Sequence, residues 1–420
     1  MNRRQQRLIG LILVGILTAG ALVGGGWWLG QRSDRQSAAS GVTVAPSPNP
    51  PAATPGIPDT STTPAPPTSQ AQAGSWQWLP AAPIPAGATY AGVWTGSELL
   101  VHGAYFRFED EKSVGRSVGA AYRPTTRTWR VLPPAPGPLQ NMEGGYHAIW
   151  TGRELLGWGM GLDAAYNPAT NRWRRIAPGG SAWAVRVWTG RQVLTWGGGC
   201  CGDDVAGGAA YTPATNRWSN LPAAPLAGRQ QTAGVWTGSE LIVVGGNNTD
   251  GKVFADAAAY DPVTRSWRRL PPMPEARTGA TVTWNGREVL VVGGQGRFGD
   301  RARPYADGVA YSPASNAWRR LPAMDSGRIW HSAVCTGRQL LVWGGQTRAG
   351  DSWTAPAHGL TYDRAANRWL PLPRSPLRGR TGHLAVWTGS QLLIWGGIPV
   401  RHSDPEKPFA DGAAYTPYPV

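Results

Sequence analysis

The stretch Trp236–Gly246, which reads WTGSELIVVGG, decides the fold, because the chain carries seven copies of its pattern. Each copy begins with W-T-G or a close variant, and a glycine stands nine residues after the first position. In five of the seven copies that glycine is doubled. The copies begin at Trp94, Trp150, Trp188, Trp236, Trp284, Cys335 and Trp387. Their spacing averages about 49 residues, which is a typical length for a four-stranded propeller blade.

Each copy continues into a second fixed pattern, which in the same unit reads YDPVTRSW over Tyr260–Trp267. All seven units contain the tyrosine, and in the first six a tryptophan follows it after seven residues. One apolar run enters the W-T-G turn, a second leaves it, a third ends at the tyrosine and a fourth carries the tryptophan. Each unit is therefore predicted to form four short strands. The 57 glycines and 38 prolines among 420 residues agree with many turns and oppose long helices.

The two ends of the repeat region complement each other. The seventh unit stops at Tyr415–Val420, before its fourth strand, whereas Trp76–Pro80 reads WQWLP and matches the sequence WRRLP of Trp267–Pro271. The N-terminal strand is predicted to complete the last blade and close the ring, which leaves no open sheet edge. The predicted fold is an all-β, seven-bladed propeller of four-stranded blades over residues 74–420.

These patterns resemble the kelch repeat of the kelch and galactose oxidase superfamily, in which a glycine pair ends a strand and a tyrosine and a tryptophan follow. Arg328-x-x-His331 and Arg380-x-x-His383 match the start of a kelch blade. The resemblance implies the propeller but no single activity, because actin-binding and adaptor proteins, galactose oxidase and bacterial sialate epimerases share it. Copper oxidase chemistry would need tyrosine and histidine ligands and a cysteine crosslinked to tyrosine. The six histidines do not show that arrangement, and we predict no cofactor.

The N-terminal part lacks the repeat and has the composition of an anchor followed by a spacer. Residues 1–7 carry three arginines, and residues 8–30 form a run of 23 residues without charge, long enough to span a bilayer. We predict a cytoplasmic tail, a transmembrane signal-anchor of bacterial type, and a disordered linker rich in Pro, Ser, Thr and Ala over 31–73. The alternative is a cleaved signal peptide of about 40 residues, which would give a secreted protein. Either way the propeller lies outside the cytoplasm, at the cell surface or in the periplasm.

The net charge of +15 raises nucleic acid, an anionic membrane or an acidic polymer as partners, and the alternative is a coding bias towards arginine. All but three of the 40 basic residues are arginines, and they are spread along the chain. They are not gathered in runs interleaved with aromatic residues, so we predict no nucleic-acid partner.

The cysteines and histidines give weaker signals. Three cysteines cannot build a disulfide framework. Cys200 and Cys201 are adjacent, which leaves open a vicinal disulfide, two free thiols, or a metal site shared with the aspartates that follow. His331 and His383 occupy the same repeat position, and their match to the kelch pattern favours a structural role over a metal pair.

Loop lengths distinguish the two faces of the predicted ring. The W-T-G turn and the turn after the tyrosine keep their lengths, whereas the interval from glycine to tyrosine ranges from 7 to 19 residues. The connections after second strands and between blades lie on one face, which we call the variable-loop face. Variable loops on a fixed scaffold commonly carry function.

Four consecutive blades place an arginine on the variable-loop face, seven residues before the W-T-G position. These residues are Arg229, Arg277, Arg328 and Arg380, and Glu143 holds the equivalent place in the second blade. A crescent of arginines at the mouth of the ring predicts bidentate binding of carboxylate or phosphate groups. The alternative is that these arginines hold neighbouring blades together through backbone carbonyls.

Three tryptophans have no place in the repeat. Trp183 and Trp330 lie five residues before the W-T-G position, where most blades have Thr, Gly or Gln, and Trp353 lies in the variable loop of the sixth blade. Exposed indoles suit stacking on sugar faces or capture of cations. The alternative is that they plug the channel of the ring.

The sequence therefore predicts a membrane-tethered, extracytoplasmic binding module without catalysis, whose ligand is a protein or an acidic glycan on the variable-loop face. The candidate ligand-binding residues are the four arginines and the three tryptophans. The alternative function is a carbohydrate-active enzyme of the sialate-epimerase kind, in which Glu143 would act as acid or base opposite the arginines.

Overall fold

The structure, a computed structural model of the chain, describes residues 74–86, 89–109, 112–137, 146–159, 161–199, 203–298, 302–400 and 408–417. The tail, anchor and linker predicted over 1–73 lie outside these ranges. Within them, no helix is both long enough and apolar enough to cross a membrane.

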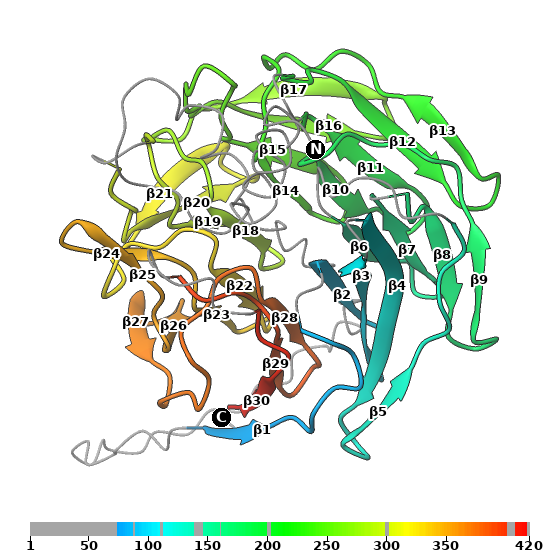
Figure 1. Cartoon of the computed structure of the whole chain (residues 1–420). Coiled ribbons are helices and arrows are strands. Elements are labelled where there is room, and N and C mark those ends of the chain that lie inside the picture. The colour runs from blue at the N-terminus through cyan, green and yellow to red at the C-terminus, as the bar shows by residue number, and fades with distance from the viewer. Residues whose placement is uncertain are drawn as a thin grey trace, which may run out of the picture.

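Seven four-stranded antiparallel sheets surround a common axis, as the sequence predicts (Figure 1). Blade 1 contains β2 (Thr89–Trp94), β3 (Leu99–Glu109), β4 (Lys112–Arg123) and β5 (Thr128–Val131). Blade 2 contains β6 (His147–Trp150), β7 (Leu155–Trp158), β8 (Ala164–Asn167) and β9 (Arg172–Arg175). Blade 3 contains β10 (Val185–Trp188), β11 (Val193–Trp196), β12 (Gly208–Thr212) and β13 (Arg217–Asn220). Blades 4 and 5 contain β14 (Ala233–Trp236), β15 (Leu241–Val244), β16 (Ala257–Asp261) and β17 (Ser266–Leu270); and β18 (Thr281–Trp284), β19 (Val289–Val292), β20 (Gly308–Ser312) and β21 (Ala317–Leu321). Blade 6 contains β22 (Ser332–Cys335), β23 (Gln339–Trp343), β26 (Gly359–Asp363) and β27 (Arg368–Pro371), with an added hairpin of β24 (Thr347–Ala349) and β25 (Ser352–Thr354). Blade 7 contains β28 (Leu384–Trp387), β29 (Leu392–Trp395), β30 (Gly412–Thr416) and β1 (Ser75–Trp78).

The N-terminal strand closes the ring in the predicted register. β1 pairs antiparallel with β30, and Trp76 lies opposite Tyr415. Blade 4 shows the same pairing within one continuous unit, where Trp267 lies opposite Tyr260. The match of WQWLP to WRRLP thus identified the closing strand correctly.

The core consists of layers between blades. Among the described residues, seven apolar clusters form, and each joins two neighbouring blades. The second strand of each blade supplies the most buried residues; all four side chains of β15 are buried. Each blade therefore depends on both neighbours for burial of its faces, which is why an open edge would be costly.

The repeated tryptophan of the fourth strand fastens each blade to the preceding one. The indole of Trp267 donates to the carbonyl of Pro222 at 3.0 Å, and that of Trp76 donates to Pro373 across the closure at 2.9 Å. All seven outer tryptophans make a bond of this kind, six of them to the proline that ends the preceding blade. The W-x-x-L-P pattern thus supplies the tryptophan that donates the hydrogen bond and, in the preceding blade, the proline whose carbonyl accepts it.

Candidate functional site

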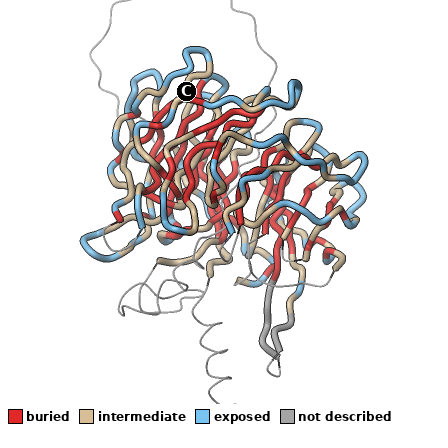
Figure 2. The backbone as a smooth tube through the Cα atoms, turned by 90° about the horizontal axis from the view of Figure 1, so that it is seen from above, coloured by how far each residue is buried: buried red, intermediate tan, exposed pale blue. Residues whose placement is uncertain are grey.

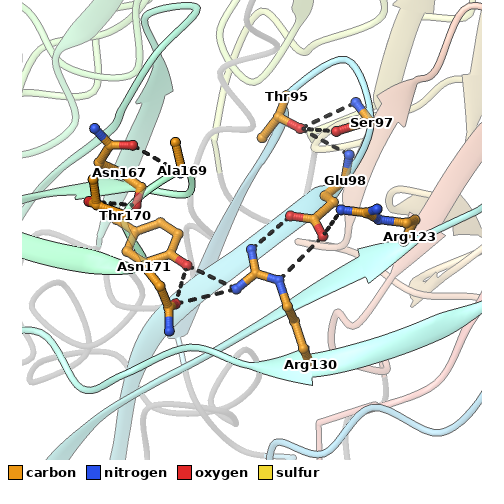
Figure 3. A network of polar contacts seen from close by, with 10 residues as sticks. Thr95, Ser97, Glu98, Arg123, Arg130, Asn167, Ala169, Thr170 and Asn171 are labelled. Carbon is orange, nitrogen blue, oxygen red and sulfur yellow. Dashed lines mark hydrogen bonds and ion pairs between the residues drawn. The ribbon is translucent and has the colours of Figure 1, made fainter.

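The face that carries the W-T-G turns is held by repeated ion pairs. In blade 1, Arg123 and Arg130 bond to Glu98 at 3.0 and 2.7 Å, and Arg130 also donates to the Tyr166 hydroxyl of blade 2 at 2.9 Å (Figure 3). The same carboxylate–arginine pair recurs in later blades as Glu154–Arg174, Glu240–Arg268 and Glu288–Arg319. Exposed turns line this face (Figure 2). The carboxylates and guanidinium groups of these pairs are already engaged with one another. We therefore place the candidate site on the opposite, variable-loop face.

On that face, the Arg229 side chain ties together the bases of two loops. Its guanidinium donates to both carboxylate oxygens of Asp256, at 2.5 and 3.0 Å, to the carbonyl of Gly245 at 3.1 Å and to that of Ala227 at 2.9 Å. It also lies 3.9 Å from the ring centre of Phe254. The side chain is 0% exposed. We call this arrangement a latch.

The backbone of the latch arginine joins two blades. The Arg229 carbonyl accepts from the N–H of Gly198 in blade 3 at 2.9 Å, and its own N–H donates to Val205 at 3.3 Å. Gly198 is the second glycine of its pair and has φ of 93°. A Cβ there would lie 2.2 Å from the carbonyl of Ala182, which explains why the repeat requires glycine.

The other three predicted arginines form equivalent latches. Arg277 donates to Asp307 at 2.9 Å and Arg380 to Asp411 at 2.6 Å, whereas Arg328 donates to Asp325 at 3.0 Å and to a ring nitrogen of His358 at 2.8 Å. All three are 1% exposed or less. The four arginines are thus buried and bonded to protein groups rather than exposed at the rim, and their side-chain partners lie in the same blade or in the loop before it. Ligand binding by them stays a prediction, since the guanidinium groups are already engaged.

The tryptophans at the unusual repeat position have a left-handed backbone. Trp183 and Trp330 have φ of 57° and 51°, and the equivalent Gln231, Gly279 and Gly382 have φ of 47°, 65° and 62°. This conformation suits glycine and is strained for a bulky side chain, which is a common mark of functional positions. Trp330 leans on blade 5: its N–H donates to the Gly279 carbonyl at 3.1 Å, and its indole nitrogen lies 3.3 Å from where a Cβ of Gly279 would be. Both tryptophans are half-buried.

The third tryptophan lies on the added hairpin of blade 6. Trp353 of β25 pairs across the hairpin with Arg348 of β24, whose guanidinium lies 5.4 Å from the indole centre. Blade 1 carries the other extended hairpin of the variable-loop face, because β3 and β4 stay paired as far as Glu109 and Lys112. Two paired hairpins therefore project on this face, from blades 6 and 1, on either side of blade 7.

The sequence reasoning missed two charged residues, Arg186 and Asp163, in blades 3 and 2. Arg186 on β10 is 2% exposed, and its Nη2 donates to the Ser181 carbonyl at 2.8 Å. Its Nε and Nη1 have no hydrogen-bond partner among the described residues. Burial lowers the pKa of Arg186 to about 10, partly offset by Asp163, which ends the loop after β7. Burial also raises the pKa of Asp163. A signal was present: both residues stand where the other blades have small or apolar residues.

Three histidines lie between blades and serve packing. His331 bonds to the Thr281 hydroxyl at 2.8 Å, His383 to that of Ser332 at 2.9 Å, and His102 to that of Tyr146 at 2.7 Å. All are at most 2% exposed, and burial lowers each pKa to about 3. The structural reading of His331 and His383 fits these contacts.

Several predicted residues lie outside the described part of the chain, namely Glu143, Cys200 and Cys201. The thiol of Cys335 is described; it is free, and burial raises its pKa. Within the described ranges, no cluster of three or more His, Cys, Asp or Glu residues could hold a metal ion. A cavity of about 450 Å³ lies at the outer edge of the closure, between β1 and the segment 373–376.

Comparison with known proteins agrees with this geometry. A family model described as Attractin/LZTR1 beta-propeller matches residues 166–401. Among solved structures, a fungal alcohol oxidase of the AA5 family, in complex with copper, is similar with a TM-score of 0.61 and 13% identity. The match covers 82% of this chain and 77% of the oxidase chain. At that identity the likeness concerns the fold.

Proposed function

The chain belongs to the Attractin/LZTR1 beta-propeller family, and we propose that it is a binding module that captures a protein or an acidic glycan outside the cytoplasm. In this proposal residues 8–30 anchor the protein in the membrane and residues 31–73 hold the propeller away from it. The ligand binds to the variable-loop face.

The latches are the observation that carries the proposal. In blades 4 to 7, each latch arginine fixes the bases of the loops on the variable-loop face through several charge-assisted bonds. The loops that extend from these bases differ in length from blade to blade. A scaffold that fixes its loops before binding loses less conformational entropy when a ligand arrives, which favours recognition.

The hairpin of blade 6 is the best candidate for direct contact. The half-buried Trp353 offers an aromatic face for a sugar ring, while the Arg348 side chain, which is 6% exposed and donates to the Asp351 carbonyl at 2.9 Å, packs on the indole and holds it in place. A catalytic role of the sialate-epimerase kind would use free arginines around the mouth. The contacts of the four latch arginines do not favour it over binding.

A binding screen tests the proposal. The full chain, in detergent micelles, is applied to an array of acidic and neutral glycans and used to capture proteins from the cell envelope. We expect Trp353→Ala and Arg348→Ala to reduce capture at least tenfold. The matched control is Trp78→Ala, because Trp78 is 48% exposed on the outer edge strand and away from the hairpin. Equal capture by the hairpin variants and the control would contradict a role for this face.

A cell-fractionation experiment tests the location. We expect the full chain to sediment with membranes and to be digested by protease added to intact spheroplasts. A variant lacking residues 8–30 is expected in the soluble cytoplasmic fraction. Protection of the full chain from external protease would refute the extracytoplasmic placement.

A further inference from the structure

We propose that the face of the ring that carries the W-T-G turns docks on the anionic phospholipid surface of the membrane in which the chain is anchored. We call it the turn face; it consists of the W-T-G turns and the tyrosine turns, which are the six residues after each repeated tyrosine. The inference rests on the anchor of the proposed function and adds the surface that orients the propeller. It directs the variable-loop face, on the far side of the ring, away from the membrane.

Arginines that are spread along the chain gather on the turn face. Four W-T-G turns carry an exposed arginine directly after the glycine, namely Arg153, Arg191, Arg287 and Arg338. Seven more exposed arginines lie in the tyrosine turns, two of them in blade 1 and two in blade 6. Each of blades 1 to 6 contributes at least one, so the positive charge extends around most of the ring.

Few carboxylates of the turn face remain to neutralise these arginines. The four glutamates of the W-T-G turns already pair with arginines of the fourth strands. The two aspartates of the tyrosine turns, Asp261 and Asp363, accept from backbone N–H groups of their own turns at 2.7 and 2.9 Å. Among the eleven turn arginines, Arg123 shares Glu98, and at least nine form no ion pair with any described residue. The turn face therefore carries a large excess of positive charge.

The variable-loop face carries no such excess. Its described connections, which run after second strands and between blades, hold ten basic and ten acidic residues. The latch arginines among them are buried and paired. A general coding bias towards arginine would act on both faces alike, so it does not explain this difference.

The turn face is level and has one apolar tip. In blades 1 to 6 each third strand is joined to the fourth by four residues, so the tyrosine turns have equal lengths. The described turns contain no aromatic side chain on which nucleic-acid bases could stack. At the tip of the blade 4 tyrosine turn Val263 is 89% exposed, whereas blades 1 to 3, 5 and 6 have alanine or threonine there. A level basic surface with an apolar tip matches the plane of an anionic headgroup layer.

The chain joins the propeller on the turn face. β1 takes the place of a fourth strand, and fourth strands begin directly after a tyrosine turn, as β17 does at Ser266. Ser75, at the start of β1, lies opposite Thr416 at the end of β30. Gly74 is therefore on the turn face, and the proposed anchor is attached to the ring on this side. Tethering raises the effective concentration of the membrane surface at the face that docks.

Arginine footprinting of the full chain in lipid nanodiscs tests the docking. Phenylglyoxal modifies exposed guanidinium groups, and mass spectrometry of the digested chain measures the rate at each arginine. We expect Arg153, Arg191 and Arg287 to react at least about threefold more slowly in phosphatidylglycerol than in phosphatidylcholine nanodiscs at ~0.1 M salt. The difference should vanish at ~1 M salt, because screening is then strong.

The internal control of the footprint is Arg297, which is exposed on the variable-loop face and should react at the same rate in both lipids. Equal rates of the three turn arginines in the two lipids would overturn the proposal. Slowing of Arg297 to the same extent would also overturn it, because it would show a general effect of lipid charge without a docked face.

A variant with three turn arginines removed gives a second readout. Arg153→Ser/Arg191→Ser/Arg287→Ser introduces the residue that the same turn position has in blades 1, 4 and 7, so we expect its melting temperature to match that of the wild type. Each arginine near an anionic surface contributes a factor of about five in affinity, so the ratio of docked to undocked protein should fall on the order of a hundredfold.

Neutron reflectometry on phosphatidylglycerol bilayers measures the distance between the propeller and the headgroups. We expect that distance to be within ~10 Å for the wild type and to increase in the turn variant. The charge-matched control is Arg175→Ser/Arg269→Ser/Arg297→Ser, which removes three exposed arginines outside the turn face and should behave as the wild type. Equal distances in the turn variant and the control would refute the docking.

The remaining outcomes separate this inference from the proposals on which it rests. Protection of the turn arginines by added polyglutamate or DNA, with none by phosphatidylglycerol, would assign the face to a soluble acidic polymer and overturn docking on the membrane. If nanodiscs retain the chain without selective protection, the docking fails and the anchor stands. If nanodiscs do not retain the chain, the anchor and the docking both fail.

Discussion

Replacement of the latch arginine Arg229 by methionine tests the account of how the variable-loop face is built. The substitution keeps an unbranched apolar stem and removes the guanidinium. It breaks both bonds to Asp256 and the bonds to the carbonyls of Gly245 and Ala227. Breaking a buried ion pair costs roughly 3 to 5 kcal/mol. The lower end applies here, because the Asp256 side chain is 34% exposed and water can solvate its freed carboxylate.

We therefore expect Arg229→Met to lower the free energy of unfolding by about 3 kcal/mol. An unfolding entropy of about 2.1 cal/mol/K per residue over roughly 340 residues converts this into a drop of about 4 °C in the melting temperature. Differential scanning calorimetry of the full chain measures it. The partner variant Asp256→Asn and the double variant complete a mutant cycle, in which the two changes should be coupled by at least ~1 kcal/mol. A drop of less than ~1 °C, or strictly additive changes, would refute the latch.

Three further predictions follow from other contacts. Gly157→Ala should lower the free energy of unfolding by about 3 kcal/mol in urea titration, because its Cβ would lie 1.8 Å from the Tyr146 hydroxyl. In a Tyr146→Ala background the same change should cost less than ~1 kcal/mol. Equal costs in the two backgrounds would contradict the clash. Burial lowers the pKa of His102 from 6.5 to about 3, so the folded state takes up its proton less readily than the unfolded state. The contribution of His102 to the free energy of unfolding is therefore complete above pH 6.5 and falls by about 1.4 kcal/mol per pH unit between pH 6.5 and pH 3. His102→Gln should remove that much from the slope of unfolding free energy against pH. An unchanged slope would contradict a buried neutral imidazole. Asn216 has φ of 53°, and its Oδ1 accepts from Tyr211 and from the Ala177 N–H, each at 2.8 Å. Asn216→Ala should lower the free energy of unfolding, followed by circular dichroism, by about 2 kcal/mol. Asn216→Gly should lower it by less, because glycine adopts the left-handed backbone without strain. A larger loss for Asn216→Gly than for Asn216→Ala would refute this reasoning.

Much of the architecture could be predicted because it depends on local repeats. The W-T-G turn needs a threonine to accept from the chain three residues on and a glycine at positive φ, as Thr237 and Gly238 show. The W-x-x-L-P pattern needs a tryptophan that reaches the preceding blade. Such requirements recur at fixed spacing, so the sequence alone revealed the seven blades, the closing strand and the face on which loop length varies.

The candidate site could be predicted only in part. The four arginines were expected to be exposed at the rim, whereas each is buried and bonded to protein groups, and ligand binding by them stays a prediction. Arg186 and Asp163 were missed although the repeat register marks both, because each lies at a position where the other blades have small or apolar residues and only a comparison of all seven blades shows the difference. Ligand binding by Trp183 and Trp330 stays a prediction. The structure adds that both have a left-handed backbone, as do the glycines at the equivalent positions Gly279 and Gly382.

The amino-acid sequence by itself determined the repeat unit, the number of blades and the way the ring closes, because backbone pairing and turn geometry depend on neighbours in the chain. Only the tertiary structure decided which charges are satisfied. The carboxylate of Asp256 is 27 residues from Arg229 along the chain, beyond a loop whose length differs among blades, and no fixed spacing connects them. The ring brings that pair together, whereas among the described residues Arg186 has one hydrogen bond, to the Ser181 carbonyl.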